Sequence, residues 1–360
     1  MSIREEDVVK GSIAMLVCAA SALAALSVPG HADTPAYEIV ARMPVGGEGG
    51  WDYLTFDPAS HRLFVTRGSH VQVVDTARDT VVGDIPNTNG VHGVVLVPEV
   101  GHGFTSNGRD STVTVFDLKT LAAVASVRLP GRNPDAILYD PASERVFAFN
   151  AGSASATAID PEKNQVIGNV ALGGQPEFAV ADGRGRVYVN LEDSSAVVSF
   201  DTRTLKVLSR WPLAPGEEPT GLAMDRARRR LFSACANQKL IVLDANSGRR
   251  IADLPIGARC DGVTFDPALG LILSTNGDGT LSVIREDSAD RYTKLADVPT
   301  QRGARTVALD EATHRVYTCT AQYGETPAPT AEQPHPRARP VPGSFVILAL
   351  DAKIGPPSRH

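Results

Sequence analysis

The sequence has few aromatic residues and few cysteines, and it lacks the motifs of several common enzyme classes. Aromatic residues make up 6% of the 360 residues, and only four residues are cysteine. No CxxC or CxxCH occurs, so neither a thioredoxin-like redox motif nor covalent haem attachment is supported. There is also no GxSxG, no HExxH, no Walker loop and no GxGxxG after an expected strand. The commonest hydrolase, metalloprotease and nucleotide-binding classes therefore have no support from motifs.

The chain also lacks an excess of positive charge. Its formal net charge is −6 at pH 7, which gives no electrostatic reason to expect nucleic acid or anionic lipid as a partner. Hydrophobic residues make up 42% and charged residues 21%, as in ordinary globular proteins. The 32 glycines and 25 prolines favour tight turns and short strands over long helices.

Residues 1–32 are predicted to be a secretory signal peptide. A 16-residue apolar run, Ile13–Val28, follows Arg4 and Lys10 and is followed by small residues. The run is shorter than the roughly 20 apolar residues of a spanning helix. We therefore expect cleavage after Ala32, a periplasmic or secreted protein, and no membrane span in the mature chain. Acidic residues near the N-terminus leave an uncleaved anchor as the alternative.

A motif recurs seven times within residues 33–360, which we expect to form a single domain. Three of its copies are DPASHRLFV, DPASERVFAF and DRARRRLFSA. The first residues of the seven copies, called anchors below, are Asp57, Val97, Asp140, Asp182, Asp225, Asp266 and Asp310. Their separation of 40 to 44 residues is the period of a propeller blade with four strands. Because no segment between them has a sustained helical period, we predict an all-β, seven-bladed β-propeller.

Short apolar runs bounded by turn residues predict four antiparallel strands in each repeat. In the third repeat these runs cover residues 136–139, 145–149, 156–159 and 166–171. Residues 37–44 resemble a fourth strand, whereas residues 344–351 resemble a third strand. We therefore expect the N-terminal strand to complete the last blade and to tie the two ends of the domain together.

The repeats resemble those of a known family. The segments TVTVFDLKTLAAVASVRLPGRNPDAILYDPASERVFAFN and KLIVLDANSGRRIADLPIG are similar to the YVTN-repeat, YncE-like bacterial β-propellers, over roughly Tyr37 to Ala352. The resemblance implies an exported seven-bladed propeller. It implies no single chemistry, because repeats of this kind serve binding and several enzymatic roles.

Two sets of residues are predicted to lie on one face of the propeller, the top face, where the loops from strand four to strand one and from strand two to strand three emerge. The residues five positions before the anchors form the mouth ring around the central channel: Asp52, His92, Asp135, Glu177, Thr220, Asp261 and Arg305. The residues ten positions after the anchors form the second ring: Arg67, Asn107, Asn150, Glu192, Cys235, Asn276 and Thr320.

The mouth ring is a candidate metal site. Its four carboxylates, Asp52, Asp135, Glu177 and Asp261, would repel one another unless a cation, a proton or an arginine compensates them. Hard divalent cations such as calcium favour oxygen ligands of this kind. Six-bladed calcium-dependent lactonases have a similar set of residue types, although not the same motif. The alternative is that these residues, several of them beside proline, only cap turns.

Further residues of the top face are candidates for catalysis or ligand binding. His92 would serve as a metal ligand, a general base or a wall residue, and Arg305 would hold an anion or neutralise the acidic ring. The candidate ligand-binding residues are Trp51, Asn107, Arg109, Asn150, Glu192, Asn276 and Tyr323. Packing between blades is the alternative role for Trp51, and turn formation is the alternative for Arg109 and the three asparagines.

A proline-rich insertion, residues 323–342, interrupts the loop from strand two to strand three of the last blade. Proline favours a stiff, extended segment. It would cover the channel as a lid, present a strap to a partner, or remain a solvated loop.

Three cysteines follow the predicted signal peptide, so at most one disulfide can form within the chain. Cys235 and Cys260 are expected on top loops of adjacent blades, where a disulfide between them is geometrically conceivable. Cys319 has no motif that would support a nucleophilic role.

These features leave two functions open. The first is an exported, monomeric propeller that binds a small ligand or a protein partner on its top face. The alternative is a lactonase-like, metal-assisted hydrolase or lyase, in which mouth-ring carboxylates hold a divalent cation. The family resemblance also raises DNA binding, which the acidic charge opposes.

Overall fold

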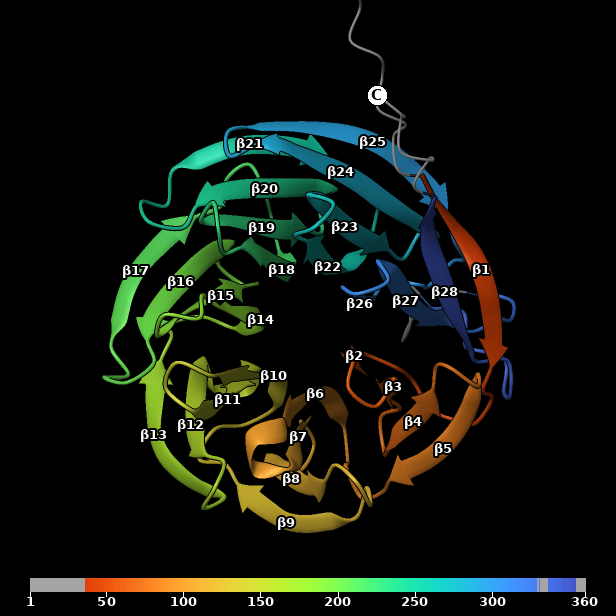
Figure 1. Ribbon diagram of the computed structural model, residues 1–360, viewed down its shortest axis with the longest axis horizontal. Helices are drawn as coiled ribbons and strands as arrows, with labels where there is room; N and C mark the ends of the chain where they lie inside the picture. Colours follow the sequence, from red (N-terminus) through yellow and green to blue (C-terminus); the bar gives the residue numbers. More distant parts are fainter. Residues whose placement is uncertain (1–35, 329, 331–335, 354–360) are drawn as a thin grey trace, which may run out of the picture.

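The computed structural model describes residues 36–328, 330 and 336–353, and these form seven four-stranded antiparallel sheets arranged radially around one axis (Figure 1). This confirms the predicted all-β, seven-bladed propeller. The predicted signal peptide, residues 1–32, lies outside the described residues. Within them, no helix is long and apolar enough to cross a membrane.

In each blade the first strand lies nearest the axis and the fourth lies at the rim (Figure 1). The strands of blades one to three are β2 (Leu54–Asp57), β3 (Arg62–Thr66), β4 (Val71–Asp75), β5 (Thr80–Ile85); β6 (Val91–Val97), β7 (His102–Asn107), β8 (Thr112–Asp117), β9 (Ala123–Arg128); and β10 (Pro134–Asp140), β11 (Arg145–Asn150), β12 (Ser155–Asp160), β13 (Gln165–Ala171). The strands of blades four to six are β14 (Pro176–Ala181), β15 (Arg186–Leu191), β16 (Ala196–Asp201), β17 (Val207–Pro212); β18 (Pro219–Asp225), β19 (Arg230–Cys235), β20 (Lys239–Asp244), β21 (Arg250–Pro255); and β22 (Cys260–Asp266), β23 (Leu271–Asn276), β24 (Thr280–Ser288), β25 (Arg291–Pro299). Two short 3₁₀ helices, η1 (Pro98–Val100) and η2 (Ala151–Ser153), follow β6 and β11.

The seventh blade is assembled from both ends of the domain. Its sheet has the order β1–β28–β27–β26, with β26 (Ala308–Asp310), β27 (Arg315–Thr320), β28 (Val346–Lys353) and β1 (Ala36–Pro44). The antiparallel pairing of β1 with β28 runs from Ala36 opposite Lys353 to Pro44 opposite Val346. The predicted closure by the N-terminal strand is therefore confirmed.

The anchors mark the turn that follows each innermost strand. The Asp57 carboxylate accepts a hydrogen bond from the backbone N–H of Ala59 at 3.0 Å, and the Asp225 carboxylate accepts one from Ala227 at 2.8 Å. Aspartate suits this position because its short side chain can bond to the backbone two residues further on. The recurring aspartate in the sequence is therefore a turn-forming residue.

The core lies between neighbouring blades. The middle strands, such as β11 and β12, are buried on both faces because a neighbouring sheet packs against each face, whereas most residues of a rim strand such as β13 are exposed. Aromatic side chains join adjacent blades, as where the rings of Phe147 and Phe200 lie 5.3 Å apart. This packing makes a rigid frame for the loops of the top face.

Candidate functional site

β-Bulges lie at the mouth-ring positions of five blades. The pairing of the innermost strand shifts register between Val91 and Val94 in β6 and between Pro134 and Ile137 in β10. The equivalent shifts in β14, β18 and β22 enclose the mouth-ring residues Glu177, Thr220 and Asp261. A bulge leaves a residue outside the regular pairing and re-aims its side chain. The backbone thus provides a reason why these residues meet others from neighbouring blades.

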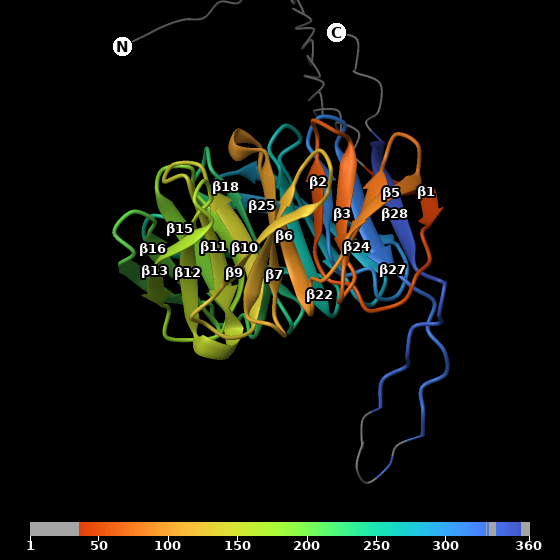
Figure 2. The same ribbon diagram turned by 90° about the horizontal axis from the view of Figure 1, so that it is seen from below.

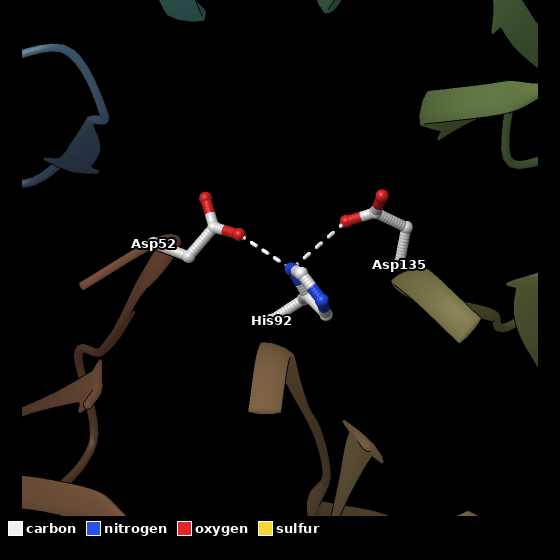
Figure 3. A group of neighbouring side chains, drawn as sticks. All are labelled: Asp52, His92 and Asp135. Atoms are coloured by element: carbon white, nitrogen blue, oxygen red, sulfur yellow. Dashed lines mark hydrogen bonds and ion pairs between the residues drawn. The ribbon is translucent and has the colours of Figure 1, made fainter. Parts of the chain in front are cut away.

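Three mouth-ring residues from adjacent blades meet at one point (Figure 3). His92 Nδ1 lies 2.7 Å from Asp52 Oδ2 and 3.1 Å from Asp135 Oδ1. The side chains are 30%, 20% and 15% exposed for His92, Asp52 and Asp135, so solvent reaches the group. Their candidate ligand atoms all lie within 4.8 Å of one another. The group can hold a metal ion.

The position of His92 Nδ1 restricts its chemistry. Both carboxylates approach the same nitrogen, so when both are ionised and no metal is bound, this nitrogen carries a proton and donates it to them. Burial lowers the pKa of His92, but the hydrogen bond to Asp52 and the charges of Asp135 and Asp261 outweigh it and leave the pKa raised. Glycine at 108 leaves room for the other ring nitrogen, because a Cβ there would lie 2.9 Å from His92 Nε2.

The negative charges of the mouth-ring carboxylates are only partly compensated by positively charged side chains. Burial and the neighbouring carboxylates of Asp52 and Asp261 raise the pKa of Asp135 to about 7, although His92 opposes them. Burial and the charge of Asp52 likewise raise the pKa of Asp261 to about 6, despite Arg305. Burial, followed by the charge of Asp135, raises the pKa of Glu177 well above its usual range. These carboxyl groups hold protons more tightly than isolated ones do, which a bound cation would reverse.

Asp261 and Arg305 pair with each other beside the metal-binding group. Arg305 Nε donates to Asp261 Oδ2 at 2.5 Å, and Arg305 Nη2 donates to the Trp51 carbonyl at 3.2 Å. The same guanidinium lies 4.0 Å from Asp52 Oδ1. Burial alone would lower the pKa of Arg305, but the charges of Asp261 and Asp52 raise it. Arg305 therefore neutralises the acidic ring, one of the two roles considered from the sequence.

Glu177 is also engaged, by a residue that the sequence analysis did not select. The Tyr53 hydroxyl donates to Glu177 Oε1 at 3.1 Å, and its ring packs against Phe178 with centroids 5.1 Å apart. Burial and the charge of Glu177 raise the pKa of Tyr53 well above its usual value. Tyr53 directly follows Asp52, and this adjacency to a mouth-ring residue is the feature of the sequence that could have pointed to its role. Of the four carboxylates predicted to hold a metal, only Asp52 and Asp135 join His92 in the group.

The asparagines of the second ring form side-chain hydrogen bonds within their own blades. Asn107 Nδ2 donates to the hydroxyls of Thr112 and Thr114 at 3.1 and 2.9 Å, and its Oδ1 accepts from Thr105 at 2.8 Å. Asn276 bonds in the same way to Thr280, Ser282 and Ser274, and Asn150 donates to Ser155 and Thr157. All three asparagines are buried. The structure therefore does not bring them to a ligand surface. In the sequence, the hydroxyl residues that follow each asparagine indicate its role in hydrogen bonding within the blade.

Two predicted ligand-binding residues lie beside the metal-binding group. A cavity of about 400 Å³ is lined by Trp51, Asp52, His92, Arg109 and Asn133. Trp51 is buried, and its Nε1 has no hydrogen-bond partner within the described residues. Asn133 was not selected from the sequence.

Glu192 lies away from that cavity, on an acidic part of the top face. It accepts a hydrogen bond from Gln175 Nε2 at 2.6 Å, and it lines a cavity of about 380 Å³ with Asp193, Glu217 and Glu218. Burial and the charges of Glu218 and Asp193 raise the pKa of Glu192.

The three described cysteines are free and buried. Cys260 Sγ donates to the Cys235 carbonyl at 3.1 Å, so the two residues are neighbours without a disulfide between them. Burial raises the pKa of each thiol to about 12. Such thiols are poor nucleophiles at neutral pH.

The described part of the proline-rich insertion projects from the top face, which points downward in Figure 2. At its base Tyr323 forms an antiparallel bridge with Pro340, and Gly324 N–H donates to the Arg339 carbonyl at 2.9 Å. Tyr323 also reaches the ring of Trp51, with centroids 6.3 Å apart. The base of the insertion is therefore tied to the top face near the mouth ring.

No protein-family model and no curated protein matches the chain. Among solved structures, hydrazine synthase from Kuenenia stuttgartiensis is similar at 14% identity and a TM-score of 0.67, over 77% of this chain and 92% of that chain. A chain of the mitotic checkpoint complex is similar at 12% identity and a TM-score of 0.72, over 99% of both chains. Structural similarity at such low sequence identity shows a shared fold and nothing about function. The chain is a seven-bladed β-propeller with distant structural neighbours.

Proposed function

We propose that this protein is a binding propeller whose top face carries a divalent cation held by Asp52, His92 and Asp135. The observation that supports the proposal is the single nitrogen, His92 Nδ1, that two carboxylates approach at 2.7 and 3.1 Å. A cation in place of the shared proton would be bound by one nitrogen and two oxygens. It would also offset the burial and the carboxylate repulsion that raise the pKa of Asp135.

The donor set favours a transition metal over the calcium expected from the sequence. An imidazole nitrogen suits zinc and two carboxylates suit manganese, whereas calcium prefers six to eight oxygen ligands. Glu177 and Asp261, which would have supplied further oxygens, are engaged by Tyr53 and Arg305. We therefore propose zinc or manganese as the resident ion.

A ligand would have access to the cation. Three protein ligands leave at least one coordination position for another molecule. The cavity of about 400 Å³ adjoins Asp52 and His92, and Trp51 and Arg109 offer it an aromatic wall and a positive charge. The propeller fold is commonly a binding scaffold. The predicted export signal supports a role outside the cytoplasm. We propose that the protein is a monomer that binds a small ligand or an exported protein.

Metal-assisted hydrolysis is the second candidate, and the incomplete coordination of a three-ligand site favours it. Such a site polarises a carbonyl or activates water. Hydrolysis of a lactone or ester by the zinc-loaded protein, absent from the metal-free protein, would support this activity; a zinc-loaded protein without hydrolysis would leave binding as the function.

Thermal melting of dialysed protein with Zn²⁺, Mn²⁺ or Ca²⁺ tests the proposed site. We expect Zn²⁺ or Mn²⁺ to raise the melting temperature, because an ion that binds only the folded state stabilises it. His92→Ala should lose the rise. His314→Ala is the matched control, since His314 Nδ1 lies 2.7 Å from Asp266 Oδ2 in a similar pair that is not part of a three-ligand group within the described residues. Equal rises in both variants, or none in the wild type, would contradict the proposal.

A further inference from the structure

A separate cavity of about 550 Å³ lies between the top loops of blades six and seven and the base of the insertion. Arg259, which precedes β22, lines one side, and Arg302 and Arg305, which precede β26, line another. Arg337 from the insertion completes a set of four arginines. One carboxylate, Asp261, lines the same cavity.

The positive charge of this cavity is largely uncompensated. Arg305 is paired with Asp261, but Arg259, Arg302 and Arg337 have no carboxylate within salt-bridge distance in the part of the chain that the structure describes. Arg259 donates to the backbone carbonyl of Gly277 at 3.1 Å instead. Guanidinium groups without anionic partners, gathered around one cavity, favour binding of carboxylate or phosphate oxygens.

Contacts among the loops hold the side chains that line the cavity in place. The Arg302 guanidinium lies over the Tyr323 ring, 5.3 Å from its centroid, which restrains the arginine. The Arg302 carbonyl accepts a hydrogen bond from Thr320 Oγ1 at 2.7 Å, which holds the loop. Gly303 has a φ of +87°, and a Cβ there would lie 2.4 Å from the Tyr323 hydroxyl. Glycine therefore permits both the turn and the close approach of Tyr323.

A neighbouring part of the top face has the reverse charge. The cavity at blades four and five is lined by Glu192, Asp193, Glu217 and Glu218. An anion near the top face is therefore repelled from that side and attracted to the arginines of blades six and seven.

We propose that the arginine-lined cavity binds a small organic anion, with its oxyanion held by Arg302 and Arg337 and its apolar part against Tyr323 and Pro336. The volume suits a small-molecule ligand, since such sites commonly measure about 300 to 1,000 Å³. The site does not require the cation proposed above. It adjoins the metal-binding group through Arg305, which pairs with Asp261 and lies 4.0 Å from Asp52 Oδ1.

Isothermal titration calorimetry with phenyl phosphate, benzoate and neutral benzamide tests the proposal. The protein should be freed of metal by a chelating resin, because a soluble chelator is itself a polyanion. We expect at least one of the two anions to bind with a dissociation constant below about 1 mM, and benzamide to bind at least about 10-fold more weakly. Tighter binding of phenyl phosphate would identify a phosphate site, and tighter binding of benzoate a carboxylate site.

Arginine variants locate the binding. Arg302→Gln and Arg337→Gln should each weaken binding of the preferred anion by about 5- to 10-fold. Arg78→Gln, which removes an exposed arginine beside Asp75 in the turn from β4 to β5, should leave it unchanged within about twofold. Arg337 lies outside the blades, so its variant tests the site even if Arg302→Gln fails to fold.

The proposal would be overturned if neither anion bound, if benzamide bound equally well, or if Arg78→Gln had the same effect as the other two variants. Because the measurement is made without metal, its outcome is independent of the cation site.

Discussion

The mouth ring and the second ring have one residue in each blade and the same repeat spacing, yet the structure uses them differently. Asp135 and His92 of the mouth ring make contacts between blades and leave their charges incompletely balanced. Asn107 and Asn276 of the second ring satisfy their polar atoms within single blades. Regular spacing on one face therefore does not indicate a shared function. The decisive difference is whether the polar atoms have partners inside the residue's own sheet.

The local backbone accounts for this difference. Mouth-ring residues such as Asp135 lie at bulges of the innermost strand, whereas Asn107 and Asn276 end regularly paired second strands. A bulge removes a residue from regular pairing and frees its side chain for other contacts. A buried amide at a hairpin end instead needs partners nearby, which the hydroxyls of the third strand supply.

The largest expected effect concerns cation affinity. The double variant Asp52→Asn/Asp135→Asn removes both anionic ligands and should weaken Zn²⁺ binding by about 1,000-fold, or about 4 kcal/mol, in calorimetric titration. Its unfolding free energy without metal should equal or exceed that of the wild type, because the repulsion between carboxylates is gone. Unchanged affinity would mean that these residues do not bind the ion.

A second-ring variant should show the reverse pattern. Asn276→Ala leaves buried hydroxyls without their partner and should lower the unfolding free energy by roughly 3 kcal/mol in urea denaturation. Zn²⁺ affinity should change less than about threefold. Asn89→Ala is the control, since this exposed asparagine donates to Asp110 on the surface. A loss of affinity without a loss of stability would remove the distinction between the rings.

The pH dependence of stability isolates the charge of the mouth ring. A carboxyl group whose pKa is raised by folding binds its proton more tightly in the folded state, so its contribution to stability is lost as the pH rises. For Asp135, with a pKa of about 7, the loss falls between about pH 4 and 7. Metal-free wild type should lose about 2 kcal/mol more than Asp135→Asn across this range in urea denaturation. Parallel curves for the two proteins would exclude this contribution.

The smallest expected effect comes from Arg305, a cation 4.0 Å from Asp52. Arg305→Gln removes repulsion toward a bound ion and should strengthen Zn²⁺ binding by about threefold. Arg315→Gln, which breaks a pair with Asp351, is the control and should not change the affinity. Weaker Zn²⁺ binding in Arg305→Gln would show that Arg305 mainly positions Asp52.

The fold follows from the sequence because its signals are local and repeated. Turn aspartates such as Asp57 and Asp225 recur at the period of a blade, and the ends of the chain supply complementary strands. The mouth ring could be predicted for the same reason. Its partners could not: the pairing of Asp261 with Arg305 and of Glu177 with Tyr53 depends on side-chain directions across blades. The arginine-lined cavity also escaped prediction, because Arg259, Arg302 and Arg337 come from three separate loops.

Anomalous X-ray scattering at the zinc absorption edge tests the central claim most directly. A crystal of the protein grown with Zn²⁺ should show a strong anomalous peak among His92, Asp52 and Asp135, about 2.0 to 2.2 Å from the ligand atoms. The peak should be absent in crystals of His92→Ala. A wild-type crystal with no peak at this position, and with His92 Nδ1 still paired with both carboxylates, would contradict the claim that the mouth ring is a metal site.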